Sequence, residues 1–134
     1  MCYCGGEDTP METDKKTILI VEDESVLSQA MSFKFAKEGF DVKLAANGEE
    51  ALELLRAGSI DFMILDLIMP VMTGFDVIET MQKEHLVVPL IVLSNLGQKE
   101  DIDRMAQLGV KDYHIKANTP IAELVTMVKE KLSL

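Results

Sequence analysis

The sequence predicts one α/β domain in which helices cover both faces of a five-stranded parallel sheet. Its 134 residues are the size of a single ordinary domain. Hydrophobic residues make up 48% of the chain and charged residues 27%, which is enough to build a core without disulfides or a bound metal. Five short apolar runs alternate with five helical patterns, and this alternation is typical of parallel strands joined by helices.

The expected strands are short apolar runs, and the first of them, Ile18 to Val21, is typical of a strand buried on both faces. The other four are Phe40 to Ala45, Phe62 to Leu65 ending on Asp66, Pro89 to Leu93 ending on Ser94, and Asp112 to Ile115 followed by Lys116.

The first helix is expected after Ser25 and before Gly39, and it carries two apolar stripes. The stripes consist of Val26, Ala30 and Phe33, and of Leu27, Met31 and Phe35. We expect these Met and Phe stripes to be core rather than a cofactor site.

The next helices have clear boundary signals. Asn47 is a predicted N-cap with Glu50 three residues on, as in a capping box, and Gly58 ends that helix. The third helix follows a loop that contains Gly74 and runs through Ile78 and Met81. The fourth extends from Lys99 to Leu108, before Gly109.

The last helix has the clearest pattern. Thr119 is the expected N-cap and Pro120 the first helical residue. One apolar face is formed by Ile121, Leu124, Val125, Val128 and Leu132.

Charge and hydropathy exclude several classes of protein. Lys and Arg number 13 against 23 Asp and Glu, so the formal net charge of −10 disfavours nucleic-acid binding by this chain alone. Neither a run of eighteen apolar residues nor a secretory signal is present, so no membrane association and a cytoplasmic location are expected. Residues 1–16 read as a flexible N-terminal leader, and Cys2 and Cys4 within it as incidental.

Polar residues follow the predicted strands at their carboxyl ends. The first strand leads into Glu22, Asp23 and Glu24, and the others lead into Asp66, Ser94 with Asn95, and Lys116. If the first, third, fourth and fifth strands are neighbours, carboxylates, a hydroxyl and an ammonium converge where ligands of such sheets bind.

This set of groups has a chemical logic. Clustered carboxylates repel one another, and a hard divalent cation such as Mg²⁺ relieves that repulsion. The metal also screens an incoming phosphoryl group, so that a carboxylate can attack it, while a lysine and a hydroxyl hold its oxygens. These residues therefore predict a magnesium-dependent aspartyl-phosphate site.

Residues 17–134 resemble a receiver domain of two-component response regulators. The resemblance depends on an ordered set of short motifs rather than on any one of them. They are Ile18-Leu19-Ile20-Val21-Glu22-Asp23-Glu24, Asn47-Gly48-Glu49-Glu50-Ala51-Leu52, Asp66-Leu67-Ile68-Met69-Pro70, Gly74, Val92-Leu93-Ser94, Tyr113 and Lys116. The resemblance implies a flavodoxin-like (βα)5 three-layer sandwich.

The resemblance also implies roles for the site residues. Asp66 would accept a phosphoryl group from a sensor histidine kinase or a histidine phosphotransfer protein, in a phosphorelay. It implies a signalling domain rather than an enzyme, one that catalyses its own phosphotransfer and slow dephosphorylation. Mg²⁺ would be held by Glu22, Asp23, Asp66 and the backbone carbonyl of Ile68. The residues that bind the phosphoryl group or take part in the conformational switch would be Ser94, Asn95, Lys116 and Tyr113.

The family implies output through the fourth helix, fifth strand and fifth helix, toward a downstream protein or a second copy of the chain. These elements are Lys99 to Gly109, Asp112 to Ile115 and Thr119 to Leu132. The sequence departs from the family at Ala117, where proline is usual, at Ile68, which is often polar, and at Asn95, where a small residue is commoner.

Two rival functions fail on the residues that they require. A haloacid-dehalogenase-like phosphohydrolase needs a second Asp two residues after its nucleophile, and this position holds Ile68. Flavin binding needs a phosphate loop and aromatic stacking surfaces, which the sequence does not offer. A receiver-like module that binds partners without phosphorylation stays open, as does the choice between a stand-alone receiver and a piece of a longer regulator.

Overall fold

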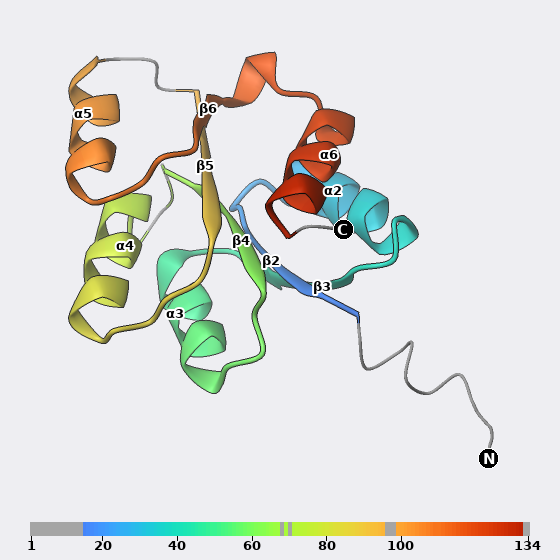
Figure 1. The fold of residues 1–134 in the computed structure, drawn as a ribbon, viewed down its shortest axis with the longest axis horizontal. Coiled ribbons are helices and arrows are strands. Elements are labelled where there is room, and N and C mark those ends of the chain that lie inside the picture. The colour runs from blue at the N-terminus through green and yellow to red at the C-terminus, as the bar shows by residue number, and fades with distance from the viewer. Residues whose placement is uncertain (1–14, 68, 70, 96–98, 133–134) are drawn as a thin grey trace.

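The computed structural model describes residues 15–67, 69, 71–95 and 99–132. Its five strands form one parallel sheet with the order β3-β2-β4-β5-β6 (Figure 1). The strands are β2 (Thr17–Val21), β3 (Asp41–Ala45), β4 (Phe62–Asp66), β5 (Leu90–Ser94) and β6 (Tyr113–Ile115). The predicted sheet is confirmed, and each strand begins and ends within one residue of the expected bounds.

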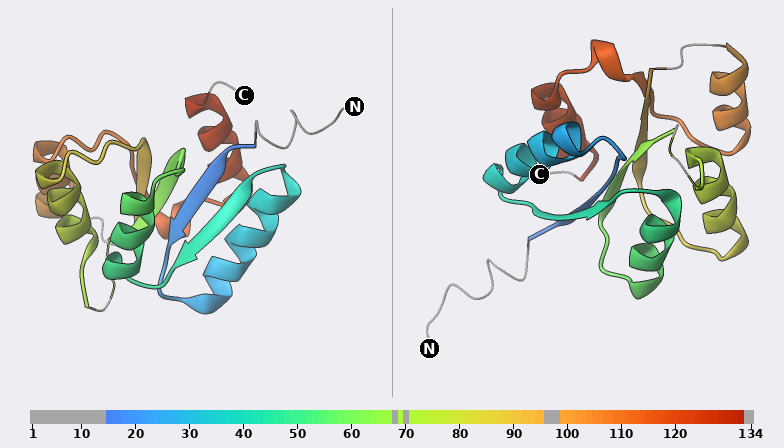
Figure 2. Two further views of the ribbon diagram at one scale, coloured as in Figure 1. Left: turned by 90° about the horizontal axis from the view of Figure 1, so that it is seen from below. Right: turned by 180° about the vertical axis from the view of Figure 1, so that it is seen from behind.

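Five helices cover the two faces of this sheet. They are α2 (Ser25–Lys37), α3 (Gly48–Ala57), α4 (Gly74–Lys83), α5 (Lys99–Gln107) and α6 (Ile121–Lys131). Helices α2 and α6 lie on one face, and α3, α4 and α5 lie on the other (Figure 2). The three-layer α/β sandwich is therefore confirmed.

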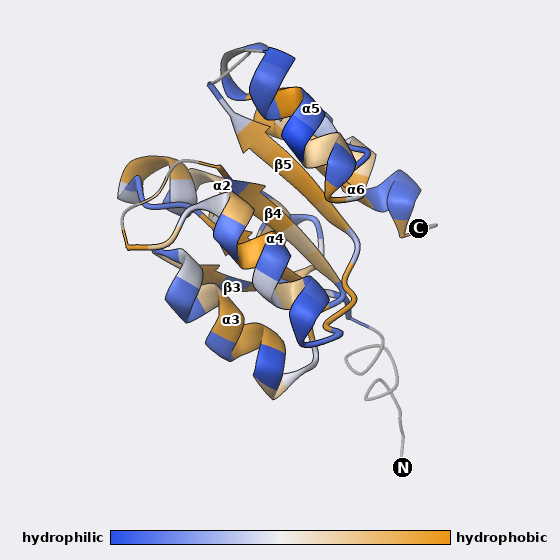
Figure 3. Ribbon diagram, turned by 90° about the vertical axis from the view of Figure 1, so that its left-hand side faces the viewer, coloured by the Kyte–Doolittle hydropathy of each residue, from blue (hydrophilic) through white to orange (hydrophobic). Residues whose placement is uncertain are grey.

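Side chains that alternate along the strands form a separate core on each face. On the α2 and α6 face, Ile18 and Ile20 of β2 pack with Met31 and Phe35 of α2. On the other face, Leu19 and Val21 lie among residues of α3 and α4. The central strands are apolar on both sides because both sides are covered, as Figure 3 shows for β4 and β5.

The prediction for the first helix is half wrong. Met31 and Phe35 are buried, but the stripe of Val26, Ala30 and Phe33 faces outward, with Val26 76% and Phe33 71% exposed and Ala30 also exposed. A helix packed on a sheet buries one face, and α2 is apolar on more than one. Ser25 is the first helical residue rather than a cap, since Glu24 occupies the N-cap position without a side-chain hydrogen bond.

Other helix boundaries follow their predicted signals closely. Asn47 Oδ1 accepts a hydrogen bond from Glu50 N at 2.9 Å, and Glu50 reaches back to Ala46 N at 2.8 Å, one residue before the position that a capping box requires. Gly58 and Gly109 follow α3 and α5 with φ of 87° and 88°, which glycine adopts without strain.

The start of the last helix differs from the prediction by one residue. Pro120, with φ −63° and ψ 153°, is the N-cap, and α6 begins at Ile121. Thr119 does not cap the helix, because its hydroxyl donates to the carbonyl of Ile115 at 2.9 Å. The expected apolar face of α6 is confirmed, with Leu124, Val125 and Val128 buried.

Within the described ranges, no helix combines the length and the apolar character needed to cross a membrane. Of the expected leader, only Lys15 and Lys16 are described, so Cys2 and Cys4 lie outside the described residues.

Candidate functional site

The sheet brings four strand ends together at its carboxyl edge. Strands β2, β4, β5 and β6 are consecutive neighbours in the sheet, and Ser94 pairs with Ile115 in register. An open pocket of about 500 Å³ lies at this edge. Its lining residues are Glu22, Asp23, Glu24, Asp66, Ser94, Asn95 and Lys116. The convergence that the strand ends predicted is present.

Three of the four carboxylates that line this pocket, Glu22, Asp23 and Asp66, form a cluster. Glu22 and Asp66 are 4% and 5% exposed, whereas Asp23 is exposed. Each offers an oxygen atom, and these three oxygens lie within 4.8 Å of one another. An all-oxygen ligand set of this size, open to solvent on one side, fits a hard divalent cation that keeps some of its water.

Lys116 lies between the two buried carboxylates. Its Nζ is 2.9 Å from Glu22 Oε1 and 3.2 Å from Asp66 Oδ2. The other oxygen of Glu22 accepts a hydrogen bond from Glu24 N at 3.2 Å. The side chain of Glu22 is therefore held by a cation and a backbone donor.

Burial and charge shift the acid–base properties of this pair. Burial, followed by the negative charge of Glu22, raises the pKa of Asp66 to about 6, and Lys116 opposes that rise only in part. Burial tends to lower the pKa of Lys116, but its contacts with Glu22 and Asp66 outweigh burial and raise it. A cation in the pocket would favour the ionised, nucleophilic form of Asp66.

Ser94 and Tyr113 form a second contact beside the carboxylates. Ser94 ends β5 and is 1% exposed. Tyr113 on β6 makes a side-chain hydrogen bond with Ser94. Burial raises the pKa of the Tyr113 phenol, this hydrogen bond opposes the rise, and the charge of Asp101 adds to it. The two residues named as switch partners are therefore in direct contact.

The remaining predicted residues lie at the rim of the pocket or outside the described part. Asn95 is exposed at the pocket edge. Lys116 opens a short 3-10 turn, Lys116–Asn118, in the loop where the family usually has proline. Ile68 lies outside the described residues, so the structure does not place its carbonyl.

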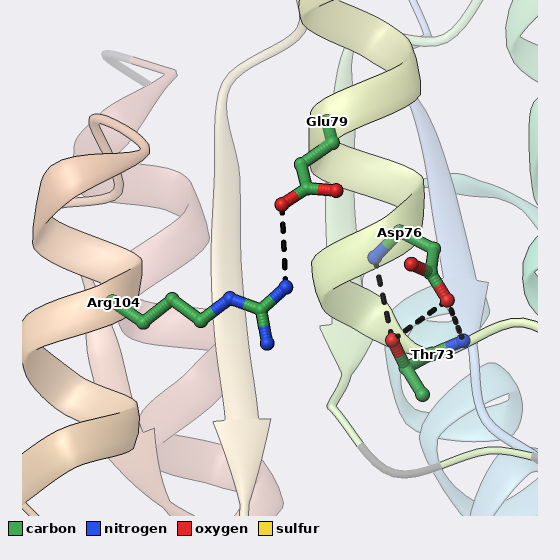
Figure 4. A network of polar contacts seen from close by, with 4 residues as sticks. All are labelled: Thr73, Asp76, Glu79 and Arg104. Carbon is green, nitrogen blue, oxygen red and sulfur yellow. Dashed lines mark hydrogen bonds and ion pairs between the residues drawn. The ribbon is translucent and has the colours of Figure 1, made fainter.

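Sequence reasoning missed how the loop after Asp66 is fixed. Gly74 is the first residue of α4, its N–H donates to Leu67 O at 2.8 Å, and a Cβ there would lie 2.9 Å from Asp66 O. Thr73 and Asp76 cap the helix reciprocally (Figure 4). A Thr followed three residues later by an acid was the signal for this capping box.

Comparisons with known proteins agree with this geometry. The model of the response regulator receiver domain matches residues 18–129. The response regulator SaeR of Staphylococcus aureus (strain USA300) is 34% identical over 116 residues, which are 87% of this chain and 50% of that protein. The probable transcriptional regulator ycf27 of Cyanophora paradoxa is 34% identical over 110 residues, 82% of this chain and 46% of that protein. The chain thus spans about half the length of these relatives.

Solved structures give the same result. The receiver domain of the Francisella response regulator 1452 superposes with a TM-score of 0.81 at 28% identity, covering 90% of this chain and all of that one. A CheY-like receiver domain protein from Methanospirillum hungatei JF-1 has a TM-score of 0.82 at 24% identity over 90% of this chain and 95% of its own, which shows a shared fold. From the family match, these relatives and the acidic pocket, the chain belongs to the response regulator receiver family.

Proposed function

We propose that this receiver domain is a phosphorylation switch in which Asp66 accepts a phosphoryl group. The observation that carries the proposal is the position of Asp66, which is buried at the end of β4 and shares Lys116 with the buried carboxylate of Glu22. If Asp66 only formed an ion pair with Lys116, the nearby acids Glu22 and Asp23 would serve no purpose. They would only raise the free-energy cost of burying negative charge.

The proposed transfer is a displacement at phosphorus. An oxygen of Asp66 forms the new P–O bond, and the P–N bond of a phosphohistidine breaks, with its electron pair passing to the imidazole. Mg²⁺, held by Glu22, Asp23, Asp66 and the carbonyl of Ile68, would supply charge neutralisation when bound. Lys116 then pairs with a phosphoryl oxygen, and the Ser94 hydroxyl donates a hydrogen bond to another.

Helix α2 begins directly after Asp23 and Glu24, which line the mouth of the pocket, so a donor docked on α2 would lie next to Asp66. We propose that the exposed apolar face of α2, formed by Val26, Ala30 and Phe33, is the docking surface of that donor. Its continuity with the acceptor pocket supports this assignment. The donor would be a sensor histidine kinase or a histidine phosphotransfer protein.

The output side of the proposal concerns α5, β6 and α6. This chain spans about half the length of its relatives, and some of them are named as probable transcriptional regulators. For this chain we propose signalling by protein contact or homodimerisation through these elements, in the cytoplasm and without direct nucleic-acid binding. The negative net charge of −10 supports the last point.

The test is labelling with a small phosphodonor, acetyl phosphate, in the presence of Mg²⁺. The parent chain should gain a base-labile acyl phosphate that hydroxylamine removes, and Asp66→Asn should not. The matched control is Asp61→Asn. Asp61 directly precedes β4 and accepts a hydrogen bond from Thr17 N at 2.8 Å, so it lies at the amino ends of the strands, away from the pocket. A parent chain that neither labels nor responds to beryllium fluoride would instead be a receiver-like module that acts without phosphorylation.

A further inference from the structure

Helix α5 is attached to the domain more weakly than the other helices on its face. Met105 is the one buried side chain among its nine residues, all of which the structure describes. Ile102 is 39% exposed, and the helix is mostly hydrophilic (Figure 3). Since apolar burial is the main force that docks a helix, α5 depends on contacts of another kind.

Arg104 provides such contacts with α4. Its guanidinium carbon lies 4.0 Å from the centre of the Phe75 ring, and a terminal nitrogen lies 3.2 Å from Glu79 Oε2. Phe75 and Glu79 are four residues apart, so they occupy adjacent positions on one face of α4. The planar guanidinium meets the ring and the carboxylate together, and Figure 4 shows Arg104 extending from α5 toward Glu79.

A further contact joins the same two helices. The side-chain amide of Gln82 donates to the carbonyl of Leu108, just after the end of α5. Gln82 lies one turn beyond Glu79 on α4. Phe75, Glu79 and Gln82 therefore form a line of α4 residues that contact the C-terminal half of α5 and the residue after it.

The contacts between α4 and α5 link two segments that leave the pocket, one after Asp66 and one after Ser94. Helix α4 begins at Gly74, whose N–H is bonded to Leu67 O directly after Asp66. Helix α5 comes after β5, which ends at Ser94 in the same pocket. The contacts of Arg104 thus tie the helix that starts at the acceptor loop to the helix that follows the Ser94 strand.

We propose that Arg104, with Phe75 and Glu79, is a latch that holds α5 in its observed position and opposes its rearrangement on phosphorylation. The effect on phosphorylation rests on the proposed function, whereas the attachment of α5 does not. The side chains of Arg104 and Glu79 are about half exposed and each contact is individually weak, so the latch can open without unfolding the core.

Amide hydrogen exchange tests the attachment, with Arg104→Gln as the variant. Loss of the cation over Phe75 and of the ion pair should speed exchange of the α5 amides about fivefold, with α3 amides unchanged. Arg56→Gln is the matched control, because Arg56 pairs with Glu84 at 2.6 and 2.8 Å and thereby joins α3 to the end of α4. Unchanged α5 exchange in Arg104→Gln, or equal acceleration in both variants, would overturn the latch.

A second arm tests the opposition to the switch. With Mg²⁺, beryllium fluoride should bind Arg104→Gln about fivefold more tightly than the parent or Arg56→Gln, because the phosphorylated-like state no longer has to break the latch. Glu79→Gln should tighten binding less, and the double variant should add little to Arg104→Gln alone. Faster exchange with unchanged affinity would overturn the switch role. If the parent fails to bind beryllium fluoride, the proposed function fails, and the exchange data still decide whether Arg104 fastens α5.

Discussion

Lys116 lies 3.2 Å from Asp66, and yet the pKa of Asp66 is raised to about 6. The reason is that Lys116 is shared: it is closer to Glu22, at 2.9 Å, and burial together with the charge of Glu22 outweighs its effect on Asp66. The ionised acceptor is therefore destabilised in the metal-free pocket, and this has consequences that can be measured.

The first prediction concerns stability and pH. The carboxyl of Asp66 ionises near pH 4 in the unfolded chain and at about 6 in the folded one, so folding is favoured below both values and loses stability as the pH rises through 6. Without metal, Asp66→Asn should raise the free energy of unfolding by about 1 to 2 kcal/mol near pH 8 and much less near pH 4. Urea titrations at the two pH values measure this. A variant less stable than the parent near pH 8 would contradict a net unfavourable environment for the ionised carboxylate.

The second prediction concerns magnesium. Binding to the folded state alone should stabilise the parent by about 2.7 kcal/mol when Mg²⁺ is about 100 times its dissociation constant. Asp23→Asn removes one of three clustered carboxylates and should remove most of this gain, whereas Asp61→Asn should keep it. Melting temperatures with Mg²⁺ or with a chelator provide the measurement. Equal gains in Asp23→Asn and the parent would exclude Asp23 as a ligand.

The third prediction concerns the contact between Ser94 and Tyr113. Tyr113→Phe keeps the ring but loses the hydrogen bond to Ser94, which should cost about 1 kcal/mol of stability. Labelling of Asp66 by acetyl phosphate should persist, while the change in amide exchange that beryllium fluoride induces in β6 should become smaller. Tyr113→Ala should also weaken partner binding or dimerisation. Full retention of the exchange response and of binding would make Tyr113 a core residue only.

The fourth prediction concerns donor docking on α2. Because Phe33 is exposed, Phe33→Ala should change stability by less than about 0.5 kcal/mol. Phosphotransfer from the cognate kinase should slow by about tenfold, as expected for an aromatic residue that contributes strongly to an interface, with acetyl phosphate labelling unchanged. Val87→Ala is the control. Val87 is 91% exposed and precedes β5, so it lies near the amino ends of the strands, opposite the pocket. Equal slowing in both variants would show that α2 is not the docking surface.

The fifth prediction concerns the lifetime of the phosphorylated state, and it rests on the place of Ile68 two residues after Asp66. The family resemblance implies that this side chain lies over the path of a water molecule attacking phosphorus, where isoleucine would offer no hydrogen bond and would exclude the water by its bulk. The acyl phosphate should be long-lived, and Ile68→Asn should hydrolyse severalfold faster with Mg²⁺ present. Decay of labelled protein measures both, and equal rates would mean that Ile68 does not shield the phosphoryl group.

The strands and the polar residues that end them could be predicted from sequence because each depends on local pattern. Runs such as Phe62 to Leu65 fix a strand buried on both faces, and Asp66 follows directly. Parallel topology then places strand ends at one edge, which is why the pocket could be anticipated without coordinates.

Features that depend on packing between distant segments could not be predicted in this way. Periodicity assigns Val26 and Phe33 to a helix but cannot decide which of two apolar stripes meets the sheet. The contact of Arg104 with Phe75 joins two residues that are 29 positions apart in the chain, and nothing local to either residue signals it.

The edges of the sheet have a consequence for self-association. Strand order leaves β3 and β6 at the two borders, where backbone groups can pair with another chain. Edge strand β3 carries the exposed charges Asp41 and Lys43, and β6 is only three residues long. The charges on β3 and the short length of β6 both oppose backbone pairing with a strand of a second copy. A dimer through α5, β6 and α6 would therefore form through side chains of these elements rather than by adding strands to the sheet.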